Sequence, residues 1–235
     1  MAVCLAGMTA PAMAQSAEPA PAWQVEGSVS ALSDYVWRGV SQTRRKPALQ
    51  LEVAANHASG FYVGGFVSNV DFTAVDDEND GIRYELAPYI GWSHEFGDGG
   101  NSLDVSLSRV LYPGYHDGFK VDYTELEATF NYAEYYHVGV AYSPDIFNLG
   151  ARGIYYNAGF EVPIGESGWN VKGHVGRYDL KKAAGDSYND YLIGVSREFG
   201  PVLAELSWVG TSSFGEPLSE NLDEAAMAKN RFVLG

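Results

Sequence analysis

The sequence predicts an all-β protein, a transmembrane antiparallel up-and-down β-barrel of about twelve strands. Three observations lead to this fold class. Apolar and polar residues alternate along segments of about ten residues, the connections between segments are alternately long and short, and aromatic residues gather where segments end. A strand whose two faces meet different surroundings has this period of two. Bacterial outer-membrane barrels have short periplasmic turns and longer extracellular loops.

The alternation is clearest between Asn101 and Tyr142. Residues 103–108 alternate apolar and polar side chains, and the pattern returns at 123–132 after a loop at 113–119. A tight turn at 133–135 then leads into a third alternating segment, 136–143. Strands of about ten residues with one long and one tight connection are typical of a transmembrane barrel, because a soluble sandwich usually has shorter strands.

The other strands follow in order. Residues 23–41 are expected to form one long first strand with a bulge near Ser33 and Asp34, and residues 41–47 an exposed loop. Further strands are expected at 48–56, 61–71, 82–96, 153–163, 169–178, 188–199, 202–210 and from 230 onward. Pro88 lacks a backbone N–H and therefore predicts a local bulge in its strand. Long loops are expected at 72–81, 113–119, 144–152, 179–187 and 211–229.

The aromatic residues sort to the two ends of these strands, as two interfacial girdles would require. Those beside short turns are Trp92, Phe96, Tyr132, Tyr135, Tyr136, Trp169 and Phe199. Those toward the long loops are Tyr35, Trp37, Tyr112, Tyr123, Tyr142, Tyr178 and Tyr191.

Composition excludes several classes of protein. The chain has 235 residues and a net charge of −15, which argues against nucleic acid as a partner. The mature part has no apolar run long enough for a membrane helix. The single cysteine, Cys4, excludes an internal disulfide framework. We expect no cofactor.

The amino-terminal residues have the composition of a targeting segment. Residues 1–14 are small and apolar and end in Ala12-Met13-Ala14, which resembles a signal-peptidase site. No positively charged region precedes them, so we expect a signal peptide truncated at its start. The expected organisation is a signal peptide (1–14), a periplasmic leader (15–22) and an outer-membrane barrel (23–235) whose last strand is truncated.

Several segments resemble a known family. These are DYVWRGVSQ (34–42), KPALQ (46–50), HASGFYVGGFVSNVDF (57–72), YPGY (112–115) and YNDYLIGVSREFG (188–200). Together they are similar to the TorF family of porins, over residues 25–234. The resemblance implies a bacterial outer-membrane barrel and a channel.

Strand parity assigns a set of charged residues to the lumen, because a charge that faces lipid is costly. They are Glu26, Arg38, Glu52, Arg83, Glu85, Asp104, Glu125, Glu127, Glu161, Lys172, His174, Asp190, Glu198, Glu205 and Arg231. The excess of acids favours cations. A barrel of twelve strands lies between filled and open barrels, so the lumen is either a pore or a plugged interior of paired charges.

Three other patterns in the sequence also have simpler explanations. The acidic run Asp76 to Gly81 has part of a calcium-loop spacing but lacks its last ligand, so it predicts a solvated loop and no metal site. The basic residues Arg44, Arg45 and Lys46 are candidates for contact with outer-membrane lipid headgroups and lipopolysaccharide, or a plain solvated cluster. Among the histidines only His116 falls in a long loop, and no nucleophile elbow accompanies it.

From the sequence we therefore expect an outer-membrane, porin-like channel for passive diffusion of small hydrophilic solutes, with a preference for cations, and not an enzyme. The alternative is a non-conducting structural or surface-binding barrel. A lipid-modifying outer-membrane enzyme is the third class.

Overall fold

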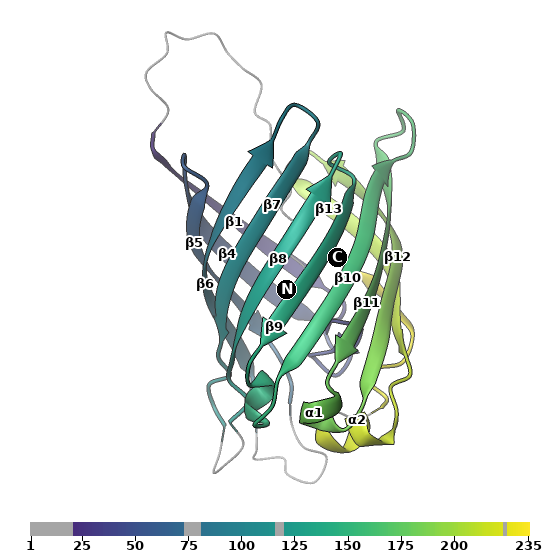
Figure 1. Ribbon diagram of the computed structural model, residues 1–235. Coiled ribbons are helices and arrows are strands. Elements are labelled where there is room, and N and C mark those ends of the chain that lie inside the picture. Colours follow the sequence, from purple (N-terminus) through teal and green to yellow (C-terminus); the bar gives the residue numbers. More distant parts are fainter. Residues whose placement is uncertain (1–20, 73–80, 116–119, 223–224) are drawn as a thin grey trace, which may run out of the picture.

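The computed structural model describes residues 21–72, 81–115, 120–222 and 225–235. Twelve antiparallel strands form one sheet in which each strand pairs with the next along the chain, and the sheet curls into an almost closed barrel (Figure 1). The predicted fold class, an up-and-down barrel of about twelve strands, is confirmed. The strands are β1 (Trp23–Leu32), β4 (Ala48–His57), β5 (Phe61–Asn69), β6 (Tyr84–Phe96), β7 (Asn101–Val110), β8 (Tyr123–Tyr132), β9 (Tyr136–Ser143), β10 (Gly153–Pro163), β11 (Trp169–Asp179), β12 (Ser187–Phe199), β13 (Val202–Ser212) and β14 (Arg231–Leu234).

Short turns join neighbouring strands at one end of the barrel, and the long connections lie at the other end (Figure 1). The long connections carry short helices: a 3-10 turn at Ile146–Asn148, α1 (Lys181–Ala184) and α2 (Glu216–Asn221). Among the described residues, no helix is both long and apolar enough to cross a membrane.

The outer face of the barrel is apolar because the strand register brings apolar residues of one parity into rows. Leu51 pairs with Val67, and Val67 pairs with Leu86, across β4, β5 and β6. Similarly, Val105 pairs with Ala128, and Ala128 with Val140, across β7, β8 and β9. The outward side chains are not packed on a protein core; Leu126, Val138 and Ile193, for example, are 48%, 55% and 50% exposed.

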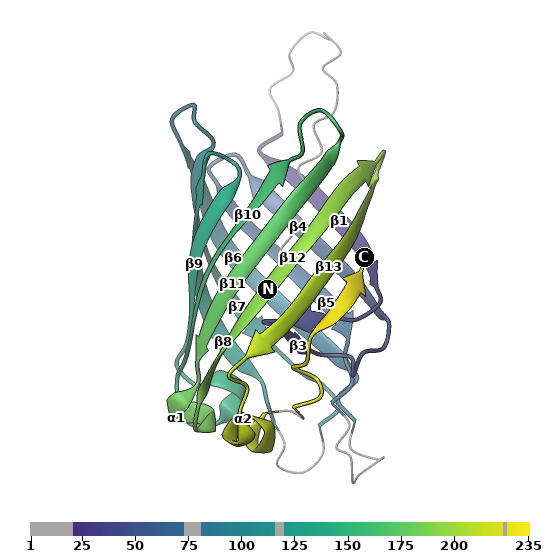
Figure 2. The same ribbon diagram turned by 90° about the vertical axis from the view of Figure 1, so that its right-hand side faces the viewer.

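The barrel closes weakly between its first and last strands. β14 pairs with only four residues of β13, Leu206 to Val209, and reaches only part of the way along the wall (Figure 2). The Ser33 N–H donates to the Leu234 carbonyl at 2.8 Å, and the Leu234 N–H donates to the Ser33 hydroxyl at 2.9 Å. Val25 and Val29 on β1 are 73% and 70% exposed, since no described strand flanks them on that side.

Two local predictions are wrong. The first strand does not continue to Ser41; β1 ends at Leu32, and the chain turns into the barrel. Pro88 makes no bulge, because Gly65 pairs with it and the β6–β7 register is the same on both sides of it. The pairing of β6 with β7 is instead interrupted between the pairs Tyr89–Ser108 and Leu86–Leu111. Pro88 lies in this gap, and because it has no backbone N–H, one hydrogen bond between the strands is missing.

Candidate functional site

The lumen at the long-loop end is filled by a hairpin that follows β1. Its two short strands are β2 (Val36–Trp37) and β3 (Val40–Ser41), with Trp37 opposite Val40. The two turn residues, Arg38 and Gly39, have φ of 47° and 81°, the pattern of a type I′ turn. A side chain on Gly39 would meet the Asp190 Cβ atom on the wall at 2.8 Å, so glycine permits both the turn and the close approach.

Arg38 holds the hairpin to the opposite wall. Its guanidinium donates two hydrogen bonds to the Glu125 carboxylate on β8, of 2.7 and 3.0 Å. Both side chains are buried, with 4% and 6% exposure. The guanidinium also lies over the rings of Trp37, Tyr155 and Tyr178, with its carbon 4.2–4.6 Å from each ring centre. Arg38 therefore combines a bidentate ion pair with cation–π contacts in a place from which water is excluded.

Two further carboxylates, Glu85 and Asp34, fix the base of the hairpin through polar contacts. The Tyr35 hydroxyl donates to Glu85 on β6 at 3.2 Å, and Tyr112 donates to the other oxygen of that carboxylate at 3.0 Å. Asp34 accepts hydrogen bonds from Ser41 and Thr43 within the segment, and forms a 2.6 Å ion pair with Arg231 on β14. These contacts connect the hairpin segment to three strands of the wall, β6, β8 and β14.

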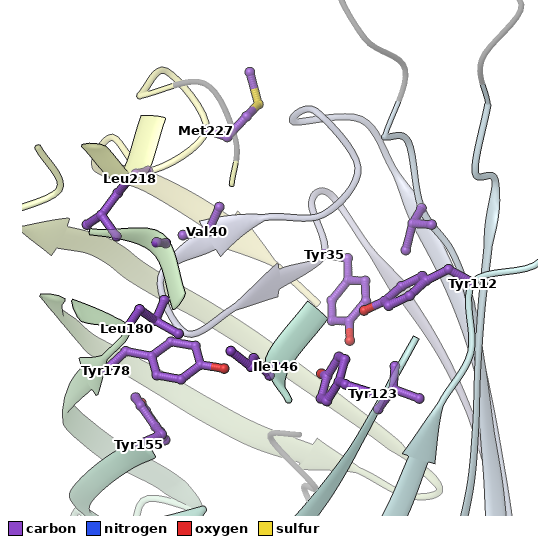
Figure 3. Close-up of a cluster of buried hydrophobic side chains, with 14 of the residues drawn as sticks. Tyr35, Val40, Tyr112, Tyr123, Ile146, Tyr155, Tyr178, Leu180, Leu218 and Met227 are labelled. Atoms are coloured by element: carbon purple, nitrogen blue, oxygen red, sulfur yellow. The ribbon is translucent and has the colours of Figure 1, made fainter. Parts of the chain in front are cut away.

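The long connections cover the outer side of the hairpin with apolar side chains. Figure 3 shows Val40 near Leu218 and Met227, while Tyr35, Tyr112 and Tyr123 lie on the other side of the hairpin. Ile146, Leu180 and Leu218 are fully buried. The Ser41 N–H donates to the Met227 carbonyl at 3.0 Å. This end of the lumen is therefore closed by a dry core, like that of a small soluble domain.

Burial and neighbouring charge shift the ionisation of the hairpin side chains. Burial, reinforced by the Glu85 carboxylate, raises the pKa of Tyr35 well above its ordinary value. Burial alone would lower the pKa of Arg38, but its neighbours, the Glu125 carboxylate first and then Tyr178 and Tyr123, together outweigh burial, and the pKa is raised. Arg38 therefore stays charged and Tyr35 stays neutral at every physiological pH.

The other half of the lumen, toward the short turns, is polar and only partly buried. Tyr62 on β5 donates to both oxygens of Asp104 at 2.8 and 2.9 Å, and Tyr89 on β6 donates to Glu52 at 2.8 Å. Each tyrosine ring crosses a glycine on the neighbouring strand, Tyr62 over Gly91 and Tyr89 over Gly64. A side chain at either glycine would displace the ring from its carboxylate.

The opposite wall of this polar half carries the basic side chains. Lys172 forms an ion pair with Glu205, and His174 lies 2.7 Å from the Tyr155 hydroxyl. That hydroxyl also donates to Asp190 at 3.0 Å, so His174 and Tyr155 stand between the polar half and the hairpin. His137 stacks on His174 with ring centres 6.0 Å apart.

The structure divides the predicted lumen residues into groups. Glu26, Glu52, Asp104, Glu127, Glu161, Lys172, His174, Glu198 and Glu205 lie on the inward parity in the polar half, with Glu26 at the open edge of β1. Arg38, Glu85, Glu125, Asp190 and Arg231 lie in the closed half around the hairpin. Arg83 differs: it precedes β6, where the strand alternation has not begun, and its guanidinium lies at the outer rim beside Asp71.

The predicted exposed loop at 41–47 is only half right. Ser41, Gln42 and Thr43 are buried under the barrel rim, whereas Arg45 and Lys46 are exposed. Arg45 donates to the Ala226 carbonyl and Lys46 pairs with Asp71 at 2.7 Å. The signal peptide, the acidic run from Asp76 to Asp80, and His116 lie outside the described residues.

Sequence reasoning missed the hairpin, and with it the roles of Asp34, Tyr35 and Thr43. Residues 35–41 alternate like any strand, so their pattern fits the wall as well as the interior. The available signal was the Arg38-Gly39 pair, because a glycine in the second position of a two-residue loop is typical of a tight hairpin turn.

Comparison with known proteins gives one family. No curated protein matches the chain. A family model described as a bacterial protein of unknown function (Gcw_chp) matches residues 16–233, which include the barrel strands from β1 to β13 and most of β14. The chain therefore belongs to this bacterial family.

Proposed function

We propose that this protein is an outer-membrane barrel of the porin type, similar to the TorF family, that passes small hydrophilic solutes when its hairpin leaves the lumen. The observation that carries the proposal is the contrast between the two faces of the wall. The outside is apolar over its whole circumference, whereas the inside is lined with carboxylates, hydroxyls and amides. The proposal is for transport and not for catalysis.

The outer face supports a membrane location. Soluble monomers rarely expose contiguous apolar patches larger than a few hundred Å². Here each of the twelve strands of the barrel carries exposed apolar side chains. Closed barrels are the one β-architecture that satisfies all backbone groups in lipid. The family match to bacterial proteins is compatible with an outer membrane.

The wall behind the hairpin supports a passage. If the hairpin served only to fill the barrel, apolar contacts would stabilise it better than buried ions do, because desolvation offsets most of the gain from a buried ion pair. The hairpin instead meets Glu85 and Glu125 through hydrogen bonds and comes close to Asp190 at Gly39. Arg38 Nε and Asp190 Oδ2 are buried without a hydrogen-bond partner among the described residues, and water would satisfy both once the hairpin left.

The polar half of the lumen supports a preference for cations. Glu52, Asp104 and Glu127 face it from one wall, and Lys172 on the other wall is already paired with Glu205. Low-dielectric walls focus such a field and raise the local concentration of counter-ions. Small hydrophilic cations are therefore the expected solutes.

A second candidate function is a non-conducting barrel. The dry core of Ile146, Leu180 and Leu218 favours it, because this core must also part before ions can pass. Such a barrel would keep the same location with a structural or surface-binding role.

Planar-bilayer recording of the refolded protein separates the two. The wild type, the charge variant Glu125→Gln and a variant with residues 34–46 replaced by a Gly/Ser linker should fold to the same heat-modifiable barrel. The linker variant should conduct steadily, Glu125→Gln should show openings, and the wild type should be closed most of the time. A folded linker variant with no current above a protein-free membrane would remove the porin proposal and leave the non-conducting barrel.

A further inference from the structure

A groove lies on the outer rim of the barrel, at the long-loop ends of β4, β5 and β6. It has a volume of about 330 Å³ and is lined by Thr43, Lys46, Pro47, Asn69, Val70, Asp71, Arg83 and Tyr84. It lies outside the lumen, so the proposed passage of solutes does not use it.

Two cations stand at this groove on either side of one carboxylate. The Lys46 ammonium lies 2.7 Å from Asp71 Oδ2, and the Arg83 guanidinium lies 3.5 Å from Asp71 Oδ1. The backbone of Asp71 is fixed, since its N–H donates to the Gln42 carbonyl at 2.8 Å. Lys46 and Arg83 are 66% and 44% exposed, whereas Asp71 is 16% exposed. The carboxylate thus orients the two cations, and both cations are more exposed than the carboxylate.

The wall below the cations becomes apolar within two rows of the sheet. The first row is Leu49, Asn69 and Tyr84, adjacent across β4, β5 and β6. The next row, from the same register, is Leu51, Val67 and Leu86. Tyr84 is 57% and Leu49 63% exposed. A molecule held by the cations would therefore lie with its lower part against apolar wall.

The same layering is found a second time, at β7 and β8. On β7, Arg109 faces outward beside Thr124 and shares Asp122 with Lys120, and the next row is Leu107 with Leu126. The cation–carboxylate–cation arrangement is therefore repeated, and both copies stand where the apolar wall begins at the long-loop end.

We propose that the groove of Lys46 and Arg83 binds the phosphate of a lipid headgroup in the leaflet that surrounds the long-loop end. The guanidinium and ammonium donate charge-assisted hydrogen bonds to phosphate oxygens, and Tyr84, with the leucines of the rows below, contacts the acyl chains. The proposal rests on the membrane location proposed above. A free phosphate ion would gain the charged contacts but none of the apolar ones.

Native mass spectrometry of the detergent-solubilised barrel tests the site with phosphatidic acid as the phosphomonoester lipid. Phosphatidylcholine is the lipid control, since its headgroup carries a compensating cation. Inorganic phosphate added at increasing concentration distinguishes the two sources of the anion. The double variant Lys46→Gln/Arg83→Gln removes the site, and Arg197→Gln is the matched control, because Arg197 also faces outward but stacks on Trp169 and Phe199 at the short-turn end.

The wild type and Arg197→Gln should retain phosphatidic acid at collisional activation energies that remove phosphatidylcholine. At this groove the double variant should bind phosphatidic acid at least tenfold more weakly, since tenfold is about the cost of losing one of its two charge-assisted contacts. Equal retention by all three proteins overturns the proposal, and so does full displacement by inorganic phosphate at low millimolar concentration. Heat-modifiable migration and insertion into vesicles are measured on the same samples, so a failure of the membrane location is seen separately.

Discussion

Arg38 and Glu125 are 87 positions apart in the chain and meet in a bidentate ion pair inside the barrel. One residue comes from the first connection and the other from the wall strand β8. Both are nearly inaccessible to water, so each depends on the other for its charge to be tolerated.

Removing one partner of this pair should destabilise the barrel strongly. Arg38→Met leaves the Glu125 carboxylate buried and unpaired, and such changes cost about 3–5 kcal/mol. The double variant Arg38→Met/Glu125→Met should recover most of the loss, because two apolar side chains of similar volume need no desolvation. Urea unfolding in detergent micelles measures all three, and an additive double variant would contradict the interpretation of the pair.

The tyrosine–glycine contacts in the polar half make a sharp steric prediction. In Gly91→Ala the new Cβ would lie 2.2 Å from Tyr62 Cζ, so the ring must leave Asp104, at a cost of about 1–3 kcal/mol. Gly65→Ala is the matched control, since a Cβ there meets nothing within 4 Å, and its stability should change by less than about 0.5 kcal/mol. Equal effects of the two alanines would show that strand flexibility, not the ring contact, sets the cost.

Pro88→Val should stabilise the barrel. Its register position faces Arg109, between the paired residues Leu86–Leu111 and Tyr89–Ser108, and valine restores the N–H that this ladder lacks. One hydrogen bond contributes about 0.5–1.5 kcal/mol, and valine is a good strand residue. The unfolding midpoint in urea should rise. A lower midpoint would mean that the wall depends on the proline.

Stability should fall at high pH through Tyr35. Its pKa is raised in the folded protein, mainly by burial and further by Glu85, so its contribution is complete below the ordinary tyrosine value near 10 and is lost as the pH rises through the higher folded pKa. Between about pH 10 and 11.5 the wild type should lose stability more steeply than Tyr35→Phe. Parallel curves would assign the loss to the other buried tyrosines.

Cation preference should depend on the polar half of the lumen. In the variant whose hairpin is replaced by a linker, Glu52→Gln/Asp104→Asn should move the reversal potential in a potassium chloride gradient toward zero, because these carboxylates set the field there. Glu166→Gln, an exposed acid in the turn between β10 and β11, is the control and should leave the potential unchanged.

The wall of the barrel can be predicted from the sequence. The two faces of each strand have different surroundings, so apolar and polar residues alternate along it. Residues 153–163 form the strand that the pattern predicts, and the parity of Asp104, Glu125 and Glu127 is the observed one. The interior does not follow in the same way. Residues 36–41 alternate equally well in the wall and in the lumen, and only tertiary contacts such as Arg38 with Glu125 decide between them. Arg83 shows a second limit. It lies one residue before β6, where the alternation of the strand no longer predicts whether a side chain faces the lumen or the outside.

The contact between Asp34 and Arg231 has a consequence for assembly. Asp34 follows the first strand and Arg231 begins the last one, so the segment that fills the lumen is clasped only when the two ends of the barrel have come together. In a partly assembled barrel the hairpin segment would lack its contact with β14. Closure of the barrel and docking of the hairpin in the lumen are therefore expected to occur together.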